Sequence, residues 1–237
     1  PFSLKAAIEI NPLVRRFKIG SGEFTDIPSL IEIAKFKKQM ILSTGMSSLE
    51  EIEMVYSKLK NHTDQLCFLN CVSEYPPVFE DINLKVIPFL IKKYPDVIIG
   101  HSDHTPSIET SLAAITLGAR IIEKHVTLDK KIPCPDQSVS IDFDEFQLLS
   151  KCINNIEKAL GDNKTVHEKE IAIRSWARRS LVTIEDIKKG EILSKKNIWS
   201  KRPGTGIPSY LMDEYIGKKA IVDIPKDTII ETNMLIN

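Results

Sequence analysis

Two histidines carry the strongest chemical signal in the sequence. His104 lies in the segment GHSDHT (residues 100–105), and His125 ends EKH (residues 123–125). Each follows an apolar run of strand length, and neighbouring strands lie about 4.8 Å apart, so the two imidazoles can share one divalent cation. Such a site leaves positions open for water and substrate, which suits a Lewis acid. Two histidines that only hydrogen-bond at a strand edge are the alternative, and His101 is an alternative ligand on the opposite side of its strand.

A lysine followed by small residues predicts an anion site. The segment FKIGSGE (residues 17–23) places Lys18 inside a strand, where an ammonium group is costly unless an anion pairs with it. Ser21 and Gly22 allow the backbone to approach that anion closely. Glu23 adds a carboxylate that can orient or deprotonate a hydroxyl. An ordinary turn beside an exposed lysine fits the segment equally well.

Hydroxyl-bearing residues recur at the ends of successive apolar runs. They are Ser43 in STG (residues 43–45), Ser73 in SEY (residues 73–75) and Ser102. Hydroxyls and the amides of a helix start can seat a phosphate, although a serine there is also a routine helix cap. Their repetition, rather than any single serine, indicates a binding site.

Two further segments could contact a sugar. The turn KRPGTG (residues 201–206) presents Arg202 as a donor fork that can reach a carbonyl or carboxylate. Asp136, in CPDQ (residues 134–137), can hydrogen-bond hydroxyl groups. The segment KRPGTG more commonly indicates only a surface arginine beside a turn.

The elements that must position these residues are five apolar runs, at 17–20, 40–44, 66–71, 97–101 and 120–125. They are apolar almost throughout, as in parallel strands covered on both faces, and helical segments such as 47–61, 107–117 and 143–160 separate them. Polar residues follow all five runs, which favours a β/α barrel over a doubly wound sheet. The prediction is an α/β fold with about five of the eight units of a TIM barrel, the other three preceding this chain.

The character of the chain changes after Gly161. We expect residues 1–162 to form the C-terminal portion of the barrel, 163–178 a linker, and 179–237 a small, mostly-β domain. The last of these contains an internal echo, because DIKKGEIL (residues 186–193) matches DIPKDTII (residues 223–230). Two strand–turn–strand copies around a pseudo-twofold axis are predicted.

Composition limits the class of partner and the compartment. The formal net charge is +0, with 42% hydrophobic and 27% charged residues, which argues against nucleic acid or an anionic membrane as partner. No apolar stretch approaches the ~20 residues of a membrane helix, and the N-terminus does not resemble a signal peptide. The Cα atoms of Cys67 and Cys71 are roughly 13 Å apart if the two residues share a strand, which is too far for a disulfide. Free thiols and a cytoplasmic location are expected.

These motifs, in this order, resemble the sialic acid (N-acetylneuraminate) synthase family. The resemblance rests on FKIGSG (17–22), ILSTGM (41–46), SEYP (73–76), GHSDHT (100–105), EKH (123–125) and PD (135–136). From about Arg179 through KRPGTGI (201–207), the tail resembles the antifreeze-protein-like SAF domain of that family. The resemblance therefore spans nearly the whole chain.

The resemblance implies an enzyme that condenses phosphoenolpyruvate with an N-acetylated amino sugar aldehyde, such as N-acetylmannosamine, into a nine-carbon 2-keto sugar acid and phosphate. It implies a divalent metal, foremost Mn²⁺ with Mg²⁺ or Co²⁺ as alternatives, on His104 and His125, which with Glu23 are the catalytic residues. Phosphoenolpyruvate contacts fall on Lys18, Ser21, Ser43, Ser73 and Ser102, and sugar contacts on Glu23, Tyr75, Asp136 and Arg202. In the family this arginine comes from the partner subunit, so a domain-swapped homodimer is expected.

Several departures keep the acceptor sugar open. Ser73 is often Asn in relatives, Cys134 usually Gly, and Gln137 often His. A legionaminic acid, pseudaminic acid or spore-coat polysaccharide synthase is the alternative within the family. With Phe2 the only residue left near the first three strands, this chain alone is expected to lack part of the active site. Outside the class, a non-catalytic carbohydrate- or ice-binding module and a metal-dependent hydrolase compete, although a hydrolase normally has more acidic or histidine ligands.

Overall fold

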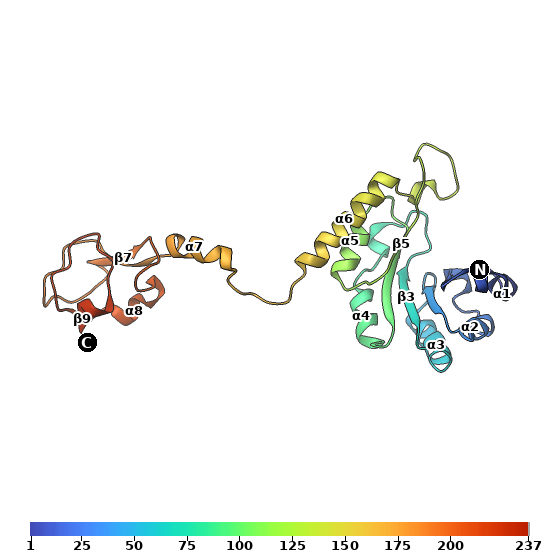
Figure 1. The fold of residues 1–237 in the computed structure, drawn as a ribbon, viewed down its shortest axis with the longest axis horizontal. Helices are drawn as coiled ribbons and strands as arrows, with labels where there is room; N and C mark the ends of the chain where they lie inside the picture. Colours follow the sequence, from blue (N-terminus) through green and yellow to red (C-terminus); the bar gives the residue numbers. More distant parts are fainter. Residues whose placement is uncertain (237) are drawn as a thin grey trace. The chain divides into compact units, whose positions relative to one another are not determined.

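The computed structural model describes residues 1–236 and divides into two compact units. The first unit is Pro1–Gly161, and the second begins at Asp162. Helix α6 (Phe143–Ala159) is the last helix of the first unit, and α7 (Glu168–Ala177) is the first of the second (Figure 1). In the part of the chain that is described, no helix is long and apolar enough to cross a membrane.

The first unit is built on a parallel sheet of five strands whose spatial order follows the chain. The strands are β1 (Arg16–Ile19), β2 (Gln39–Ser43), β3 (Leu66–Cys71), β4 (Ile98–Asp103) and β5 (Ile122–Lys124). The helices are α1 (Leu4–Ile10), α2 (Ile27–Ala34), α3 (Leu49–Leu59), α4 (Val86–Lys93), α5 (Glu109–Thr116) and α6. Sequential parallel strands with intervening helices are the pattern of a β/α barrel, so the predicted fold class is confirmed as a curled half-barrel (Figure 1).

Local sequence signals fix the helix starts next to the strand ends. Ser48 and Glu51 form a reciprocal capping box at α3, and Asp142 and Glu145 do the same at α6. Asp26 caps α2 through the backbone N–H of Ser29. These caps mark where the loops after β1, β2 and β5, which carry polar residues, end.

Alternation along the strands divides their side chains between two faces. On the outer face, Phe17, Leu42 and Phe68 pack with the helices in the main core. On the inner face a small cluster forms from Ile41, Cys67 and Leu69. The polar residues that extend this inner face lie beyond the cluster, at the carboxyl ends of the strands, where barrel sites form.

The second unit is a small antiparallel module with its own core. Its elements are β6 (Ser180–Thr183), β7 (Ile198–Lys201), α8 (Met212–Tyr215), β8 (Lys219–Ala220) and β9 (Leu235–Ile236), with α7 before them. The strands pair as β6–β7 and β8–β9. Its core includes Leu181, Ile187, Leu193 and Ile224.

The two sequence copies in this unit contact each other through equivalent residues. Ile187 and Ile224 exchange backbone hydrogen bonds of 2.8 and 2.7 Å. Asp223 accepts a hydrogen bond from the backbone N–H of Lys189 at 2.7 Å, and Asp186 accepts one from that of Lys226 at 2.8 Å. This reciprocity is what a local twofold relation between the copies produces.

Candidate functional site

One hollow of about 410 Å³ opens at the carboxyl edge of the sheet and gathers the predicted site residues of the first unit, apart from Asp136. Its lining includes Lys18, Ser21, Glu23, Ser43, Ser73, Tyr75, Ser102, His104 and His125, together with Phe2, Cys71 and Glu123. These residues come from the ends of all five strands. Side chains that are far apart in sequence therefore meet as the barrel pattern requires.

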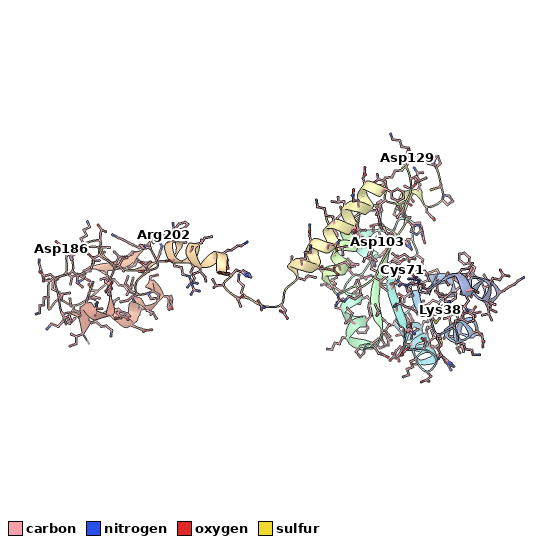
Figure 2. All side chains as sticks on the ribbon, in the orientation of Figure 1. Lys38, Cys71, Asp103, Asp129, Asp186 and Arg202 are labelled. Atoms are coloured by element: carbon pink, nitrogen blue, oxygen red, sulfur yellow. The ribbon has the colours of Figure 1, made fainter. Side chains whose placement is uncertain are left out.

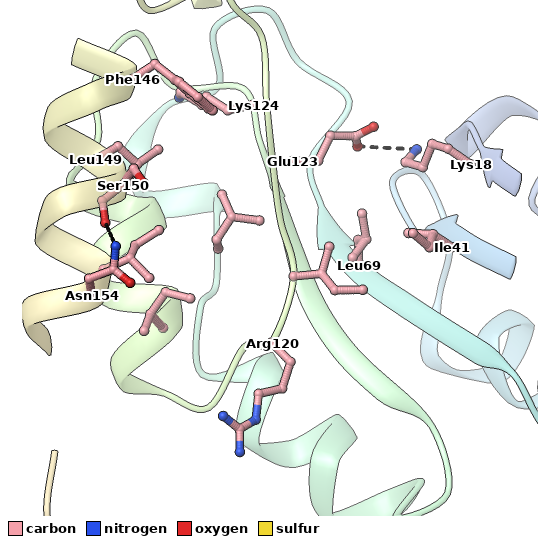
Figure 3. Close-up of a pocket in the computed structure, with 14 residues that line it drawn as sticks. Lys18, Ile41, Leu69, Arg120, Glu123, Lys124, Phe146, Leu149, Ser150 and Asn154 are labelled. Carbon is pink, nitrogen blue, oxygen red and sulfur yellow. Dashed lines mark hydrogen bonds and ion pairs between the residues drawn. The ribbon is translucent and has the colours of Figure 1, made fainter. Parts of the chain in front are cut away.

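The centre of the hollow is a carboxylate that the sequence analysis had not assigned. Glu123 Oε2 lies 3.3 Å from Lys18 Nζ (Figure 3), and it accepts hydrogen bonds from Ser102 Oγ at 2.7 Å and Ser43 Oγ at 3.4 Å. Glu123 is two residues before His125 on the same strand face, and this spacing was the available signal. Lys18 and Glu123 also line a second, largely apolar hollow beneath α6.

A second polar group lies around the glycine after β2. Gly45 N–H donates to Ser21 Oγ at 3.1 Å, and Ser21 Oγ lies 3.7 Å from Cys71 Sγ. A Cβ at position 45 would stand 2.7 Å from Ser21 Oγ and closer still to Ser73 Oγ. The glycine therefore allows the two serines to face each other across the turn.

The two histidines lie side by side, with ring centroids 5.1 Å apart and planes at 71°. His104 Nδ1 lies 2.7 Å from the Val72 carbonyl oxygen, which can only accept, so Nδ1 carries the proton and Nε2 keeps a lone pair. His125 Nδ1 lies 3.4 Å from Asp136 Oδ2, which favours the same tautomer. Carbonyl and carboxylate partners of this kind usually stand behind metal-binding imidazoles.

The environments of the two rings differ in their effect on protonation. Burial opposes charge on His104, but the hydrogen bond and negative charge of Cys71 outweigh it and raise the pKa of the imidazole. In turn, burial of Cys71 is outweighed by its contact with His104, which lowers the pKa of the thiol. The pKa of His125 is lowered by burial and next by the neighbouring His104. A neutral His125 is consistent with a ligand role.

Tyr75 closes the hollow over both rings. It stacks on His104 at 4.2 Å, meets His125 edge-on at 5.5 Å, and its hydroxyl lies 3.2 Å from His104 Nε2. Burial raises the pKa of Tyr75, so the phenol keeps its proton. Although its side chain belongs to the loop after β3, these contacts hold it against the histidine pair.

His101 lies on the other face of β4, and the structure separates it from His104. It is 2% exposed, and its Nδ1 contacts the Asn70 carbonyl at 2.9 Å. Its Nε2 has no hydrogen-bond partner among residues 1–236. The alternative in which His101 joins His125 in the hollow does not fit this placement.

Behind the histidines lies a buried ion pair that sequence reasoning missed. Lys124 Nζ lies 3.2 Å from Asp103 Oδ1, with side-chain exposures of 2% and 0%. Asp103 also accepts hydrogen bonds from the hydroxyls of Thr105, Thr110 and Ser111. Asp103 and Lys124 are paired in the sheet register, so the pair fixes the two strand ends one residue before each histidine. The register between β4 and β5 is the feature that indicates this pair, and it cannot be predicted from the sequence of one strand alone.

The network secures the charge of the carboxylate. Burial alone would raise the pKa of Asp103, but the charge of Lys124 and the hydrogen bonds outweigh it and lower that pKa. For Lys124 burial outweighs Asp103, so the pKa of the ammonium is lowered as well. Several donors independently stabilise the charged form of Asp103, so the carboxylate is the ionised partner around which the network forms.

Arg202 belongs to the second unit, just after β7 (Figure 2). Its Nε donates to the Ala177 carbonyl at 3.0 Å, and its guanidinium lies 5.5 Å from the centre of the Trp176 ring. The arginine is thus held at the end of α7. The hollow described above is formed by the first unit alone.

The residues present fit a cation held by two imidazoles. Both histidines have an oxygen partner at Nδ1, which makes Nε2 the ligand atom on each ring; on His104 the Tyr75 hydroxyl contacts that atom and would give way to the cation. Among residues 1–236 no group of three or more His, Cys, Asp or Glu side chains could hold a metal ion. Two imidazole ligands leave coordination positions that water and substrate can take, as in an open catalytic site.

The fold and the site together define a half-barrel whose carboxyl edge carries a lysine, a carboxylate and serine hydroxyls beside a histidine pair, followed by a small antiparallel module. Residues 1–165 match the model of the NeuB family, and residues 178–236 match that of the SAF domain. The chain belongs to the NeuB family, with a SAF domain after it.

Named relatives agree with this assignment. The chain is 42% identical to the N,N'-diacetyllegionaminic acid synthase of Campylobacter jejuni over 97% of its own length and 70% of that protein. It is 35% identical to the human N-acetylneuraminate-9-phosphate synthase over 93% of its length and 62% of that protein. The spore coat polysaccharide biosynthesis protein SpsE of Bacillus subtilis matches the whole chain at 30% identity, with a TM-score of 0.64, over 72% of that structure.

Proposed function

We propose that the protein condenses phosphoenolpyruvate with the open-chain aldehyde of an N-acetylated amino sugar, giving a nine-carbon 2-keto sugar acid and phosphate. One observation carries this proposal: His104 and His125 lie in the same hollow as the lysine-and-hydroxyl seat around Lys18. Membership of a family whose relatives are named as sugar-acid synthases supports it.

The reaction balances with water as the third reactant. The methylene carbon of phosphoenolpyruvate bonds to the aldehyde carbon, and the aldehyde oxygen takes up a proton. Water adds to the resulting cationic C2 of the phosphoenolpyruvate and loses its protons. The bond between C2 and the phosphate oxygen then breaks, which releases phosphate and leaves the 2-keto group. Lys18 and the hydroxyls of Ser21, Ser43, Ser73 and Ser102 would hold the phosphoenolpyruvate. They would offset its charge through charge-assisted hydrogen bonds.

The sugar would lie on the histidine side of the hollow. Glu23, Tyr75 and Asp136 would orient its hydroxyls, with Glu23 as the proton acceptor. Arg202 would complete the site from the partner subunit of a homodimer. His104 and His125 would hold the divalent cation, Mn²⁺ before Mg²⁺ or Co²⁺, which supplies Lewis-acid polarisation of the aldehyde when bound.

The acceptor sugar has two candidates. N-acetylmannosamine corresponds to the N-acetylneuraminate type of product. A diacetamido sugar leading to a legionaminic or a pseudaminic acid is favoured by the higher identity to two Campylobacter jejuni synthases, 42% and 43%, against 35% for the human enzyme.

The test is an assay of phosphate release by the full-length protein. Phosphoenolpyruvate is supplied with each sugar in turn, with Mn²⁺ and with a chelator. We expect release only when both substrates and a divalent cation are present. Release without any sugar, or none with any of these sugars, contradicts the proposal.

A further inference from the structure

Lys18, Ser43 and Ser102 form the anion seat in which phosphoenolpyruvate is proposed to bind, and the Glu123 carboxylate already occupies it. Its contacts with Lys18, Ser43 and Ser102 span 2.7 to 3.4 Å and all converge on Oε2. The three donors come from β1, β2 and β4, and Glu123 itself is on β5. One carboxylate oxygen on β5 thus sits where donors from three other strands meet.

Exposure to solvent distinguishes the Lys18–Glu123 pair from an ion pair that only stabilises the fold. Within residues 1–236, the side chains of Lys18 and Glu123 are 32% and 37% exposed, against 2% and 0% for Lys124 and Asp103. An ion pair that remains open to water contributes little net stability, so it can be separated at small cost. The Lys18–Glu123 pair is therefore able to open when a stronger ligand arrives.

A phosphate group needs the same donors. Lysine and hydroxyl groups make their strongest hydrogen bonds to ionised oxygens, and the phosphate of phosphoenolpyruvate offers more of these than a single carboxylate. Two anions a few ångströms apart repel each other strongly in a partly buried site. Glu123 and a bound phosphate consequently exclude one another from the seat.

We propose that Glu123 is a resident carboxylate that fills the anion seat between turnovers and is displaced by phosphoenolpyruvate. The inference rests on the proposed function, because it takes the seat to be the phosphoenolpyruvate site. Glu123 is then a specificity-determining residue, since an anion binds only when its charge and acceptor number exceed those of one carboxylate. A phosphorylated carboxylate meets that condition, and a simple monocarboxylate does not.

The experiment measures dissociation constants for inorganic phosphate and for phosphoenolpyruvate by calorimetry on the full-length protein. Glu123→Gln keeps the size and an acceptor oxygen but removes the competing charge. We expect both ligands to bind about tenfold more tightly to this variant. Glu123→Asp retains the charge and should stay close to the unaltered protein. Glu157→Gln, on the exposed side of α6, makes the same change in net charge and should have no effect.

Equal or weaker phosphate binding by a folded Glu123→Gln variant overturns the proposal, as does the absence of phosphate binding to either protein. If that variant does not fold, a structure of the unaltered protein with phosphoenolpyruvate decides. Separation of Lys18 Nζ from Glu123 Oε2 beyond about 4 Å supports displacement, and a retained ion pair overturns it. Failure of phosphate release with every sugar counts against the proposed function alone, because the phosphate measurement needs no turnover.

Discussion

The two faces of β4 and β5 carry the same kinds of side chain and use them differently. On the outer face, Asp103 pairs with Lys124 and accepts from hydroxyl groups of the loop and α5. On the inner face, Glu123 pairs with Lys18 and accepts from Ser43 and Ser102. The first group is closed to water and the second is partly open. Burial, rather than residue type, separates a group that holds strands together from one that can exchange its partner for a ligand.

The physical basis of the difference is the cost of an unpaired charge. A buried ion whose partner is removed cannot be solvated, whereas a half-exposed ion is rescued by water. The outer pair should therefore respond to mutation through stability, and the inner pair through ligand binding. Mutations on each face test this difference.

The largest effect is expected for Asp103→Asn. It leaves Lys124 buried without a counter-ion, and we expect the free energy of unfolding to fall by about 3–5 kcal/mol. Urea unfolding measures the loss. Asp223→Asn is the matched control, because Asp223 pairs with Lys188 at the surface, and it should cost far less. Equal losses in the two variants would contradict the contrast between closed and open pairs.

The free energy of unfolding at acidic pH gives an independent check on the same variant. The pKa of Asp103 is lowered in the folded state, so its contribution is present above the ordinary range of an aspartate. That contribution is lost as the pH falls through the lowered pKa. Asp103→Asn should therefore flatten the pH dependence of stability in this acidic window.

His104→Ala tests the functional face with the next largest effect. Removing one of two proposed ligands should lower turnover about 100-fold or more and abolish activation by Mn²⁺, while the fold is kept. Phosphate release against Mn²⁺ concentration is the measurement. His62→Ala, in the turn after α3 and outside the hollow, should retain both activity and activation. Unchanged Mn²⁺ activation in His104→Ala would remove the proposed metal role.

Gly45→Ala should have the smallest effect of the three. The added Cβ crowds Ser21 and Ser73, so the phosphoenolpyruvate KM should rise about tenfold with little change in unfolding. Gly161→Ala is the control, because a Cβ there meets no atom within 4 Å and the residue does not line the hollow. A similar KM in both variants would mean that the spacing of the two serines does not matter.

Much of the fold was predictable because the strands are apolar on both faces. Runs such as 66–71 have no alternation, which indicates parallel strands, and the polar residues after them mark the carboxyl edge. The same reasoning places Lys18, Ser43, Ser102 and the histidines at one edge, where the structure brings them together.

The partners of those residues could not be predicted. The role of Glu123 depends on where three other strands place their donors, and the Asp103–Lys124 pair depends on sheet register. Neither is a property of a local segment. Cys71 read as an ordinary apolar strand residue, although it lines the hollow beside His104.

The reciprocal contacts of the second unit have a consequence for how that unit can be divided. Asp186 of one repeat ties down the turn of the other through Lys226, and Asp223 does the same through Lys189. Each repeat thus supplies the carboxylate that accepts a hydrogen bond from the turn of the other repeat. A cut between the repeats should leave two pieces that are unstructured apart and regain order only on mixing, much as the halves of a split reporter do.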